Sequence, residues 1–183
     1  MEKSTKERIY TYIKIGIFLS LCITFFCIRE LFVEHLKYFI GGLMVFYGVE
    51  EILYESLFYR EHFWHKYKNY LGIVDVILGV ALLAAPIEYS GVCIIWATWS
   101  IVRESYEIRE LISETERVSL TIISGIESIV IIVFSVMLIC EPTEHHAMIH
   151  LYLLLIELIL TPLIPLNDEI AKKRKHKQND CDD

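Results

Sequence analysis

The chain has 183 residues, of which 55% are hydrophobic and 22% are charged, with a formal net charge of −7 and a mean hydropathy of +0.46. Soluble domains contain about 45–50% apolar residues, whereas here the charges gather in short stretches between long apolar runs. These runs are too long and too many for a soluble core of 21.5 kDa. The composition therefore argues against a soluble enzyme, a nucleic-acid-binding protein and a disordered chain, and it predicts an all-α, polytopic membrane protein.

Six apolar segments approach the length of about 20 residues that a helix needs to cross a bilayer core. The first has a basic start like that of a signal peptide, but no small-residue cleavage site follows, so we expect a retained helix. The fourth is purely apolar only to Val102, so it spans only if Arg103 and Glu104 reach an interface. Pro162 and Pro165 should kink or end the sixth. The predicted spans are residues 9–28, 36–58, 70–87, 90–102, 118–140 and 147–166.

The basic residues predict the orientation. All of the 17 Lys and Arg residues except Arg29 and Lys37 fall on one side of this arrangement, and such residues in short loops mark the cytoplasmic side. We expect a cell (inner) membrane protein with cytoplasmic termini, cytoplasmic loops around Trp64 and Arg109, and a disordered tail at residues 171–183. The expected partners are membrane lipids and further copies of the chain, and no nucleic acid.

An internal repeat divides the chain. Gly-Ile recurs near the start of each odd-numbered span and a glutamate recurs in each even-numbered span, with glycine-to-glutamate offsets of 34, 32 and 32 residues. The pairs are Gly16 with Glu50, Gly72 with Glu104, and Gly125 with Glu157. The repeat predicts three parallel two-helix hairpins, residues 9–60, 68–111 and 118–166, within one membrane domain of residues 1–170.

Small residues in the second and third spans should let these helices approach closely, since close packing is a main source of helix association in lipid. The candidates are Gly41, Gly42 and Gly48 in the second span and Gly72, Gly79, Ala81, Ala84 and Ala85 in the third.

The stretch LGIVDVILGVALLAAP, residues 71–86, resembles the recurring unit of the HdeD-like family of small six-span membrane proteins, which has a glycine start, a central glycine and a closing proline. The stretch SGIESIVIIVFSVMLICEP, residues 124–142, is similar but has its central glycine replaced, and the first unit matches only through IGI and GGLMVFYG. The similarity covers residues 13–166. It implies a hairpin-repeat membrane protein with a role in acid or envelope stress, without catalytic residues or cofactors, and not an enzyme.

Ionisable groups inside a membrane are costly and are functional candidates by default. One interpretation is a small transporter or a proton- or ion-conducting protein. The other is structural: inward-facing carboxylates paired with Lys14 or Arg103, or hydrogen-bonded as neutral acids. The glutamates of the repeat should occupy equivalent, inward-facing positions, with Glu104 the nearest to the membrane surface. The five candidates are Glu50, Asp75, Glu104, Glu127 and Glu157.

Histidines gather in the predicted outer loops. Together with His35, the candidates His145, His146 and His150 would change the formal charge of these loops from −3 to +1 as the pH falls through about 6.5. The loops therefore either sense acid or carry ordinary surface histidines. His146 and His150 could share a helix face, but the zinc-protease glutamate of HExxH is missing, so no metal site is predicted. The cysteines form no CxxC motif, and packed apolar thiols are expected.

Overall fold

The structure, a computed structural model, describes residues 2–27, 29–58, 67–113 and 118–157, and within these ranges every regular element is a helix. The all-α prediction is confirmed for this part of the chain. The helices are α1 (Glu2–Cys27), α2 (Arg29–Glu34), α3 (Leu36–Phe58), α4 (Tyr67–Ala84), α5 (Tyr89–Ser113), α6 (Val118–Cys140) and a further helix over residues 144–157.

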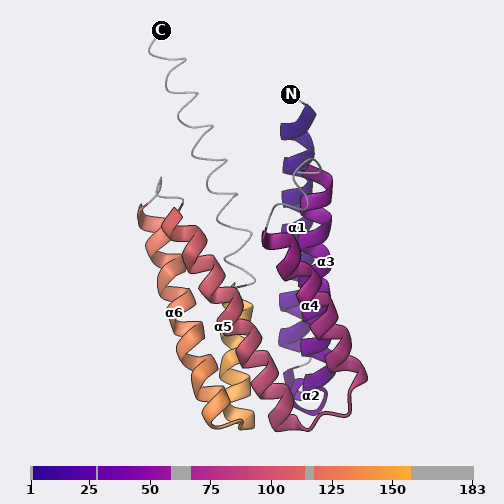
Figure 1. The fold of residues 1–183 in the computed structure, drawn as a ribbon, viewed down its shortest axis with the longest axis vertical. Coiled ribbons are helices and arrows are strands. Elements are labelled where there is room, and N and C mark those ends of the chain that lie inside the picture. The colour runs from indigo at the N-terminus through magenta and orange to yellow at the C-terminus, as the bar shows by residue number, and fades with distance from the viewer. Residues whose placement is uncertain (1, 28, 59–66, 114–117, 158–183) are drawn as a thin grey trace.

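Each predicted apolar segment coincides with one of the long helices. The short helix α2 was not predicted, and it brings Phe32 into the core with 0% exposure. The long helices run alongside one another, and the turn after α4 and the turn after α6 lie at the opposite end of the bundle from the start of α1 (Figure 1). Three predicted features lie outside the described residues: the loop 59–66, the end of the sixth span at 158–166, and the tail.

No helix in the described part of the chain is both long and apolar enough to cross a membrane. The membrane spans, their orientation and the repeat boundaries stay predictions.

Among the helices α1 to α6, the closest packing joins α3 to α4 and, to a lesser degree, α5 to α6. Each pair links two successive predicted hairpins rather than the two helices of one hairpin. Glycines explain the α3–α4 contact: a Cβ atom on Gly79 would lie 2.6 Å from the carbonyl oxygen of Gly41, and one on Gly48 would collide with the carbonyl oxygen of Gly72. The expected role is confirmed for these four glycines, while a Cβ on Gly42 would meet nothing within 4 Å.

Aromatic rings fill the middle of the bundle. Phe32 packs edge-on against Trp96 of α5 at a centroid distance of 5.8 Å and against Phe25 of α1 at 6.3 Å. Phe18 of α1 packs edge-on against Tyr47 of α3 at 5.8 Å. Edge-to-face pairs at such distances are favourable, so these rings hold α1 and α2 against α3 and α5.

The helix ends at the turns are satisfied by nearby groups. The helix α4 stops before Pro86, which cannot continue it, and Nζ of Lys37 donates a 2.7 Å hydrogen bond to the carbonyl oxygen of Ala85. This bond gives one of the two basic residues on the predicted outer side a structural role. Thr143 precedes the helix of residues 144–157, and its Oγ1 accepts a bond from the backbone N–H of His146 at 3.3 Å, as an N-cap does.

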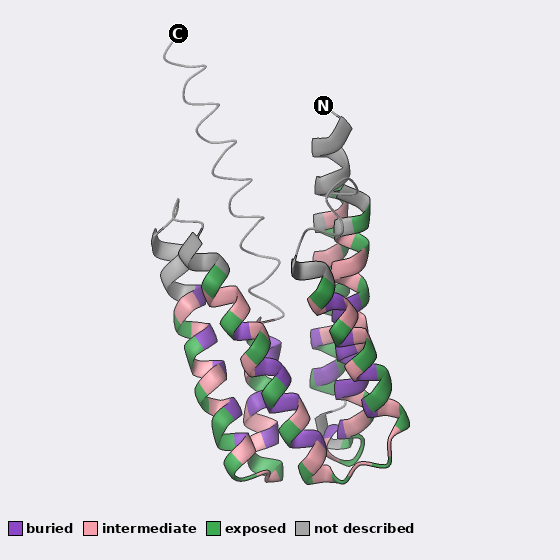
Figure 2. Ribbon diagram, viewed as in Figure 1, coloured by how far each residue is buried: buried purple, intermediate pink, exposed green. Residues whose placement is uncertain are grey.

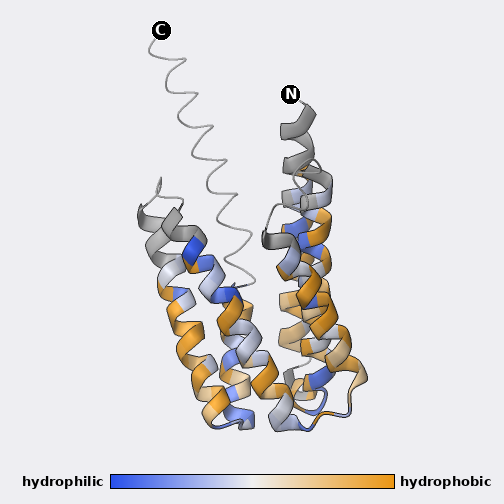
Figure 3. Cartoon of the chain, in the orientation of Figure 1, coloured by the Kyte–Doolittle hydropathy of each residue, from blue (hydrophilic) through white to orange (hydrophobic). Residues whose placement is uncertain are grey.

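The outward faces of the bundle are strongly apolar. The exposed residues of α4 and α6 in Figure 2 coincide largely with the hydrophobic colouring of Figure 3. On both helices large aliphatic side chains recur every three or four residues on the exposed face and are more than half exposed. They are Val74, Ile77 and Val80 on α4 and Ile126, Ile129 and Val133 on α6.

Candidate functional site

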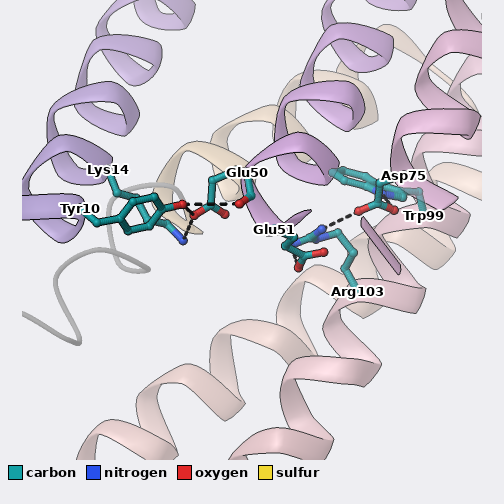
Figure 4. A network of polar contacts seen from close by, with 7 residues as sticks. All are labelled: Tyr10, Lys14, Glu50, Glu51, Asp75, Trp99 and Arg103. Carbon is teal, nitrogen blue, oxygen red and sulfur yellow. Dashed lines mark hydrogen bonds and ion pairs between the residues drawn. The ribbon is translucent and has the colours of Figure 1, made fainter. Parts of the chain in front are cut away.

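The guanidinium group of Arg103 on α5 lies among carboxylates from two other helices (Figure 4). Its Nη1 lies 2.7 Å from Oδ2 of Asp75 on α4, and its Nη2 lies 3.4 Å from Oε1 of Glu51 on α3. Asp75 is 3% exposed, and its Oδ1 accepts a 2.9 Å hydrogen bond from Nε1 of Trp99. Because Trp99 and Arg103 are four residues apart, they share a helix face, and α5 alone binds both oxygens of Asp75.

Two aromatic rings also stabilise the Arg103 charge. Its Cζ atom lies 4.4 Å from the ring centre of Tyr47 and 5.4 Å from that of Trp99, within the range of a cation–π contact. Tyr47 is 4% exposed. The Tyr47 hydroxyl and Nε of Arg103 are buried without a hydrogen-bond partner among the described residues. Both groups could therefore form further hydrogen bonds.

A second ion pair joins α1 to α3 (Figure 4). Nζ of Lys14 lies 2.9 Å from Oε1 of Glu50, and the Tyr10 hydroxyl donates a 2.6 Å hydrogen bond to the same oxygen. Consecutive helix residues point about 100° apart, which explains why Glu50 faces α1 while its neighbour Glu51 faces α5. Tyr10 and Lys14 are again four residues apart.

Two of the candidate carboxylates contact the basic residues that were named as partners from the sequence, since Glu50 binds Lys14 and Asp75 binds Arg103. The sequence did not identify Tyr10, Glu51 or Trp99. The spacing of four residues between each aromatic residue and the following basic residue was the signal that could have found Tyr10 and Trp99.

A further group of carboxylates lies where α5, α6 and the helix of residues 144–157 meet. Glu104 is 2% exposed and lies against Ser128 of α6, which is 1% exposed. Glu104 also interacts electrostatically with Glu107 and Glu127, and Glu157 interacts with these three carboxyl groups. These four residues form the acidic cluster: Glu104, Glu107, Glu127 and Glu157.

Arg103 also acts electrostatically on Glu104 and Glu157, although its guanidinium group binds Asp75 and Glu51. Oε1 of Glu127 is buried and has no hydrogen-bond partner among the described residues. Neighbouring carboxyl groups therefore lie in an environment where charges interact strongly.

The position of Glu104 near the membrane surface stays a prediction. The apolar part of the fourth span was expected to end at Val102, and α5 continues to Ser113, so Arg103 and Glu104 lie in the interior of a helix. Glu104 is more deeply buried than Glu50, whose side chain is 14% exposed. The adjacent Arg103 does not neutralise it by an ion pair, because its guanidinium group turns to the other side.

The histidines differ from one another. His145 is exposed, and Nδ1 of His146 donates a 2.8 Å hydrogen bond to the carbonyl oxygen of Glu141. His150 was expected at the membrane edge of the outer loops, at the start of the sixth span, and it is 1% exposed, with its Nε2 2.8 Å from Oγ of Ser135 on α6. The helix of residues 144–157 turns this position towards α5 and α6, so His150 does not belong to the exposed histidines of the loop.

Among the described residues, no three His, Cys, Asp or Glu side chains are placed to hold a metal ion. No family model matches the chain, and no similar curated protein or solved structure was found. The resemblance to the HdeD-like family stays a prediction.

Proposed function

We propose that the chain is a non-enzymatic, polytopic integral membrane protein whose acidic cluster takes up protons under acid conditions. The observation that carries the proposal is the burial of Glu104 beside other carboxyl groups, together with the buried Oε1 of Glu127 that has no hydrogen-bond partner among the described residues. The resemblance to HdeD-like proteins supports the same conclusion, because it implies a role in acid or envelope stress.

The apolar exterior supports the membrane location. A surface helix of a soluble protein carries polar residues on its exposed face, whereas a helix that is apolar all round is typical of a protein interior or a lipid bilayer. The exposed stripes on α4 and α6 consist of valine and isoleucine, and the polar side chains of the Arg103 network point inward (Figure 4). This distribution suits lipid outside and a polar interior.

The closeness of buried carboxyl groups supports proton uptake. An isolated ionised carboxylate is expensive in a low-dielectric interior, so we expect that Glu104 and Glu127 are not both ionised. Neighbouring like charges also spread the titration of such a group over a wide pH range. As the pH falls, successive protons should neutralise the cluster and remove the repulsion between α5, α6 and the helix of residues 144–157.

Direct measurement of proton uptake tests the proposal. Purified protein in lipid nanodiscs is taken from pH 7.5 to 5.5 in weak buffer, and the protons bound per chain are counted. The double variant Glu104→Gln/Glu157→Gln should bind fewer protons than the parent, by about one or two. Glu144→Gln is the control, because Glu144 is exposed at the other end of its helix. Equal uptake by the parent and the double variant would contradict the proposal.

A second candidate function is proton or cation conduction, as a small transporter. It is favoured by the adjacency of the acidic cluster to the network of Arg103, Asp75 and Glu51, which extends polar groups over α3, α4, α5 and α6. Liposomes with an internal pH dye and an imposed proton gradient test it. Faster dissipation with the parent than with Glu157→Gln would support conduction, and a rate equal to that of empty liposomes would exclude it without affecting proton uptake.

A further inference from the structure

His150 lies in a second polar site, away from the acidic cluster. It is seven residues before Glu157 on the same helix, which is about 10 Å along the helix axis. Its ring packs against that of Trp96 at a centroid distance of 4.5 Å, and Nε2 lies 2.8 Å from Oγ of Ser135. All three side chains are buried, with exposures of 1% or less.

The partners of Ser135 define the neutral tautomer of His150. The Ser135 hydroxyl donates its single hydrogen to the carbonyl oxygen of Ile131 at 2.8 Å. It can therefore only accept from the imidazole, so Nε2 carries the proton and Nδ1 is a free acceptor. Nδ1 of His150 and Nε1 of Trp96 are both buried without a partner in the described part of the chain. Because Ser135 is already a donor to the helix backbone, this pair is not a nucleophile held by a base.

No described carboxylate is positioned to neutralise a charged His150. Its contacts come from Trp96 of α5 and Ser135 of α6, and none of the titratable side chains at this end of the bundle forms a hydrogen bond or ion pair with it. Among the described side chains these are Glu88 in the turn before α5, Tyr89 and Cys93 on α5, Cys140 and Glu141 at the end of α6, Glu144, His145, His146 and Tyr152 on its own helix, Cys22 and Cys27 on α1, and Glu34, His35, Lys37 and Tyr38 at the end of α2 and the start of α3.

A proton on Nδ1 would create a buried cation with a new donor that has no acceptor. The face of the Trp96 ring offers a cation–π contact, but such a contact recovers only part of the hydration that a buried charge loses. The charged imidazole is therefore more stable in water than between these helices. The neutral ring holds the helices together, and the charged ring favours their separation.

We infer that His150 is an acid-sensitive latch: protonation of its ring loosens the helix of residues 144–157 from α5 and α6. The loosening occurs at the end of the bundle that carries the turns at residues 85–88 and 141–143. Acid would then have two effects: it neutralises the acidic cluster at one end of the bundle and opens the His150 contact at the other.

Reactivity of Cys93 reports the opening, because Cys93 is 0% exposed and lies three residues before Trp96 on α5. The protein retains Cys93, has its other four cysteines replaced by serine, and is studied in nanodiscs. Labelling by 4,4′-dithiodipyridine is measured at pH 7.5 and 5 relative to free cysteine at the same pH. We expect the relative rate to rise at least tenfold on acidification, and less than twofold with His150→Gln, whose amide can still donate to Ser135. His145→Gln is the exposed control and should keep the tenfold rise.

A rise that persists in His150→Gln, or no rise in the parent, would overturn the latch. Should His150→Gln fail to fold, the parent labelled with ¹⁵N-histidine gives the answer: the His150 ring must gain its proton over the pH range in which Cys93 becomes reactive. A ring that stays neutral over that range also overturns the inference. The Glu104→Gln/Glu157→Gln variant should keep the Cys93 response, so failure of the latch and failure of proton uptake by the acidic cluster are distinguishable.

Discussion

On the α3–α4 side of the bundle, Glu50, Glu51 and Asp75 all contact a basic side chain, and glycines bring the two helix backbones together. On the α5–α6 side, Glu104 is buried beside other carboxyl groups, Oε1 of Glu127 is buried without a partner among the described residues, and Ser124, Ser128 and Ser135 are buried. The first side is electrostatically complete, whereas the second is where we propose that protons bind. The two sides thus differ in how the charges of their carboxyl groups are balanced.

In the predicted repeat, the difference begins at a single position. Lys14 stands two residues before the glycine of the first Gly-Ile and binds the glutamate of the same predicted unit, Glu50. The corresponding residues of the second and third predicted units are Tyr70 and Ile123, which carry no positive charge. Under the predicted repeat, the glutamates therefore differ because the residue on the preceding helix differs.

The largest loss of stability should come from replacing Arg103, which lies at the centre of the electrostatically complete α3–α4 side. Arg103→Met leaves the buried Asp75 without its cation, and removal of one partner of a buried pair costs about 3–5 kcal/mol. Thermal unfolding in detergent, followed by circular dichroism, measures the loss. Adding Asp75→Asn should restore part of the stability, since the stranded charge is then removed. A loss no larger than that caused by Arg109→Met, an exposed site, would contradict the central role of Arg103.

The glycine contact should give the next largest effect. Gly79→Ala places a methyl group against the carbonyl oxygen of Gly41, and overpacking of this kind costs about 1–3 kcal/mol. Gly42→Ala is the matched control on the same helix pair, and it should be neutral or stabilising, because Ala is favoured over Gly in a helix by about 1 kcal/mol. Similar unfolding temperatures for the two variants would show that α3 and α4 do not need their close approach.

Much of the fold could be predicted from the sequence, because the apolar runs are long and clearly bounded. Pro86 and Pro142 mark the ends of α4 and α6, and the apolar runs before them gave the positions of these helices. The short helix α2 was missed, since six residues with no apolar periodicity of their own are ordered by burying Phe32.

The candidate site was harder to predict, because its contacts depend on how each helix is rotated about its axis. Lys14 and Arg103 were named as partners from charge alone, and this succeeded for Glu50 and Asp75. The burial of Glu104 and of His150 was not foreseen, since the sequence near each residue is partly polar and burial depends on the facing helix. Only the tertiary packing shows that Ser128 faces Glu104 and that Ser135 faces His150.

A smaller loss of stability is expected where α1 contacts α3, at the edge of the α3–α4 side. Tyr10→Phe removes the hydroxyl bound to Glu50 but leaves Lys14 in place, so the free energy of unfolding should fall by about 1 kcal/mol. Tyr12→Phe is the control, because Tyr12 is exposed on the same helix. If both variants unfold alike, the Tyr10 bond contributes nothing measurable and Lys14 alone holds Glu50.

The smallest effect on stability should come from a substitution on the α5–α6 side. Glu157→Gln keeps the size and hydrogen-bonding capacity of a protonated glutamate and removes one like charge from the acidic cluster, so the free energy of unfolding at pH 7.5 should change by less than about 1 kcal/mol. Asp75→Asn, the same chemical change on the complete side, should cost clearly more, because Arg103 loses its 2.7 Å ion pair.

Acidity sharpens this comparison. Where a folded protein binds more protons than its unfolded chain, its stability rises as the pH falls, and the acidic cluster should behave in this way. Parent and Glu157→Gln should therefore converge in stability between pH 7.5 and 5.5, because a protonated Glu157 resembles the amide, while Asp75→Asn should keep its deficit. Measuring all three with His150→Gln added removes any opposing effect of the latch. If Glu157→Gln proves as damaging as Asp75→Asn at both pH values, the charge of Glu157 must be paired, and the distinction between the two sides of the bundle fails.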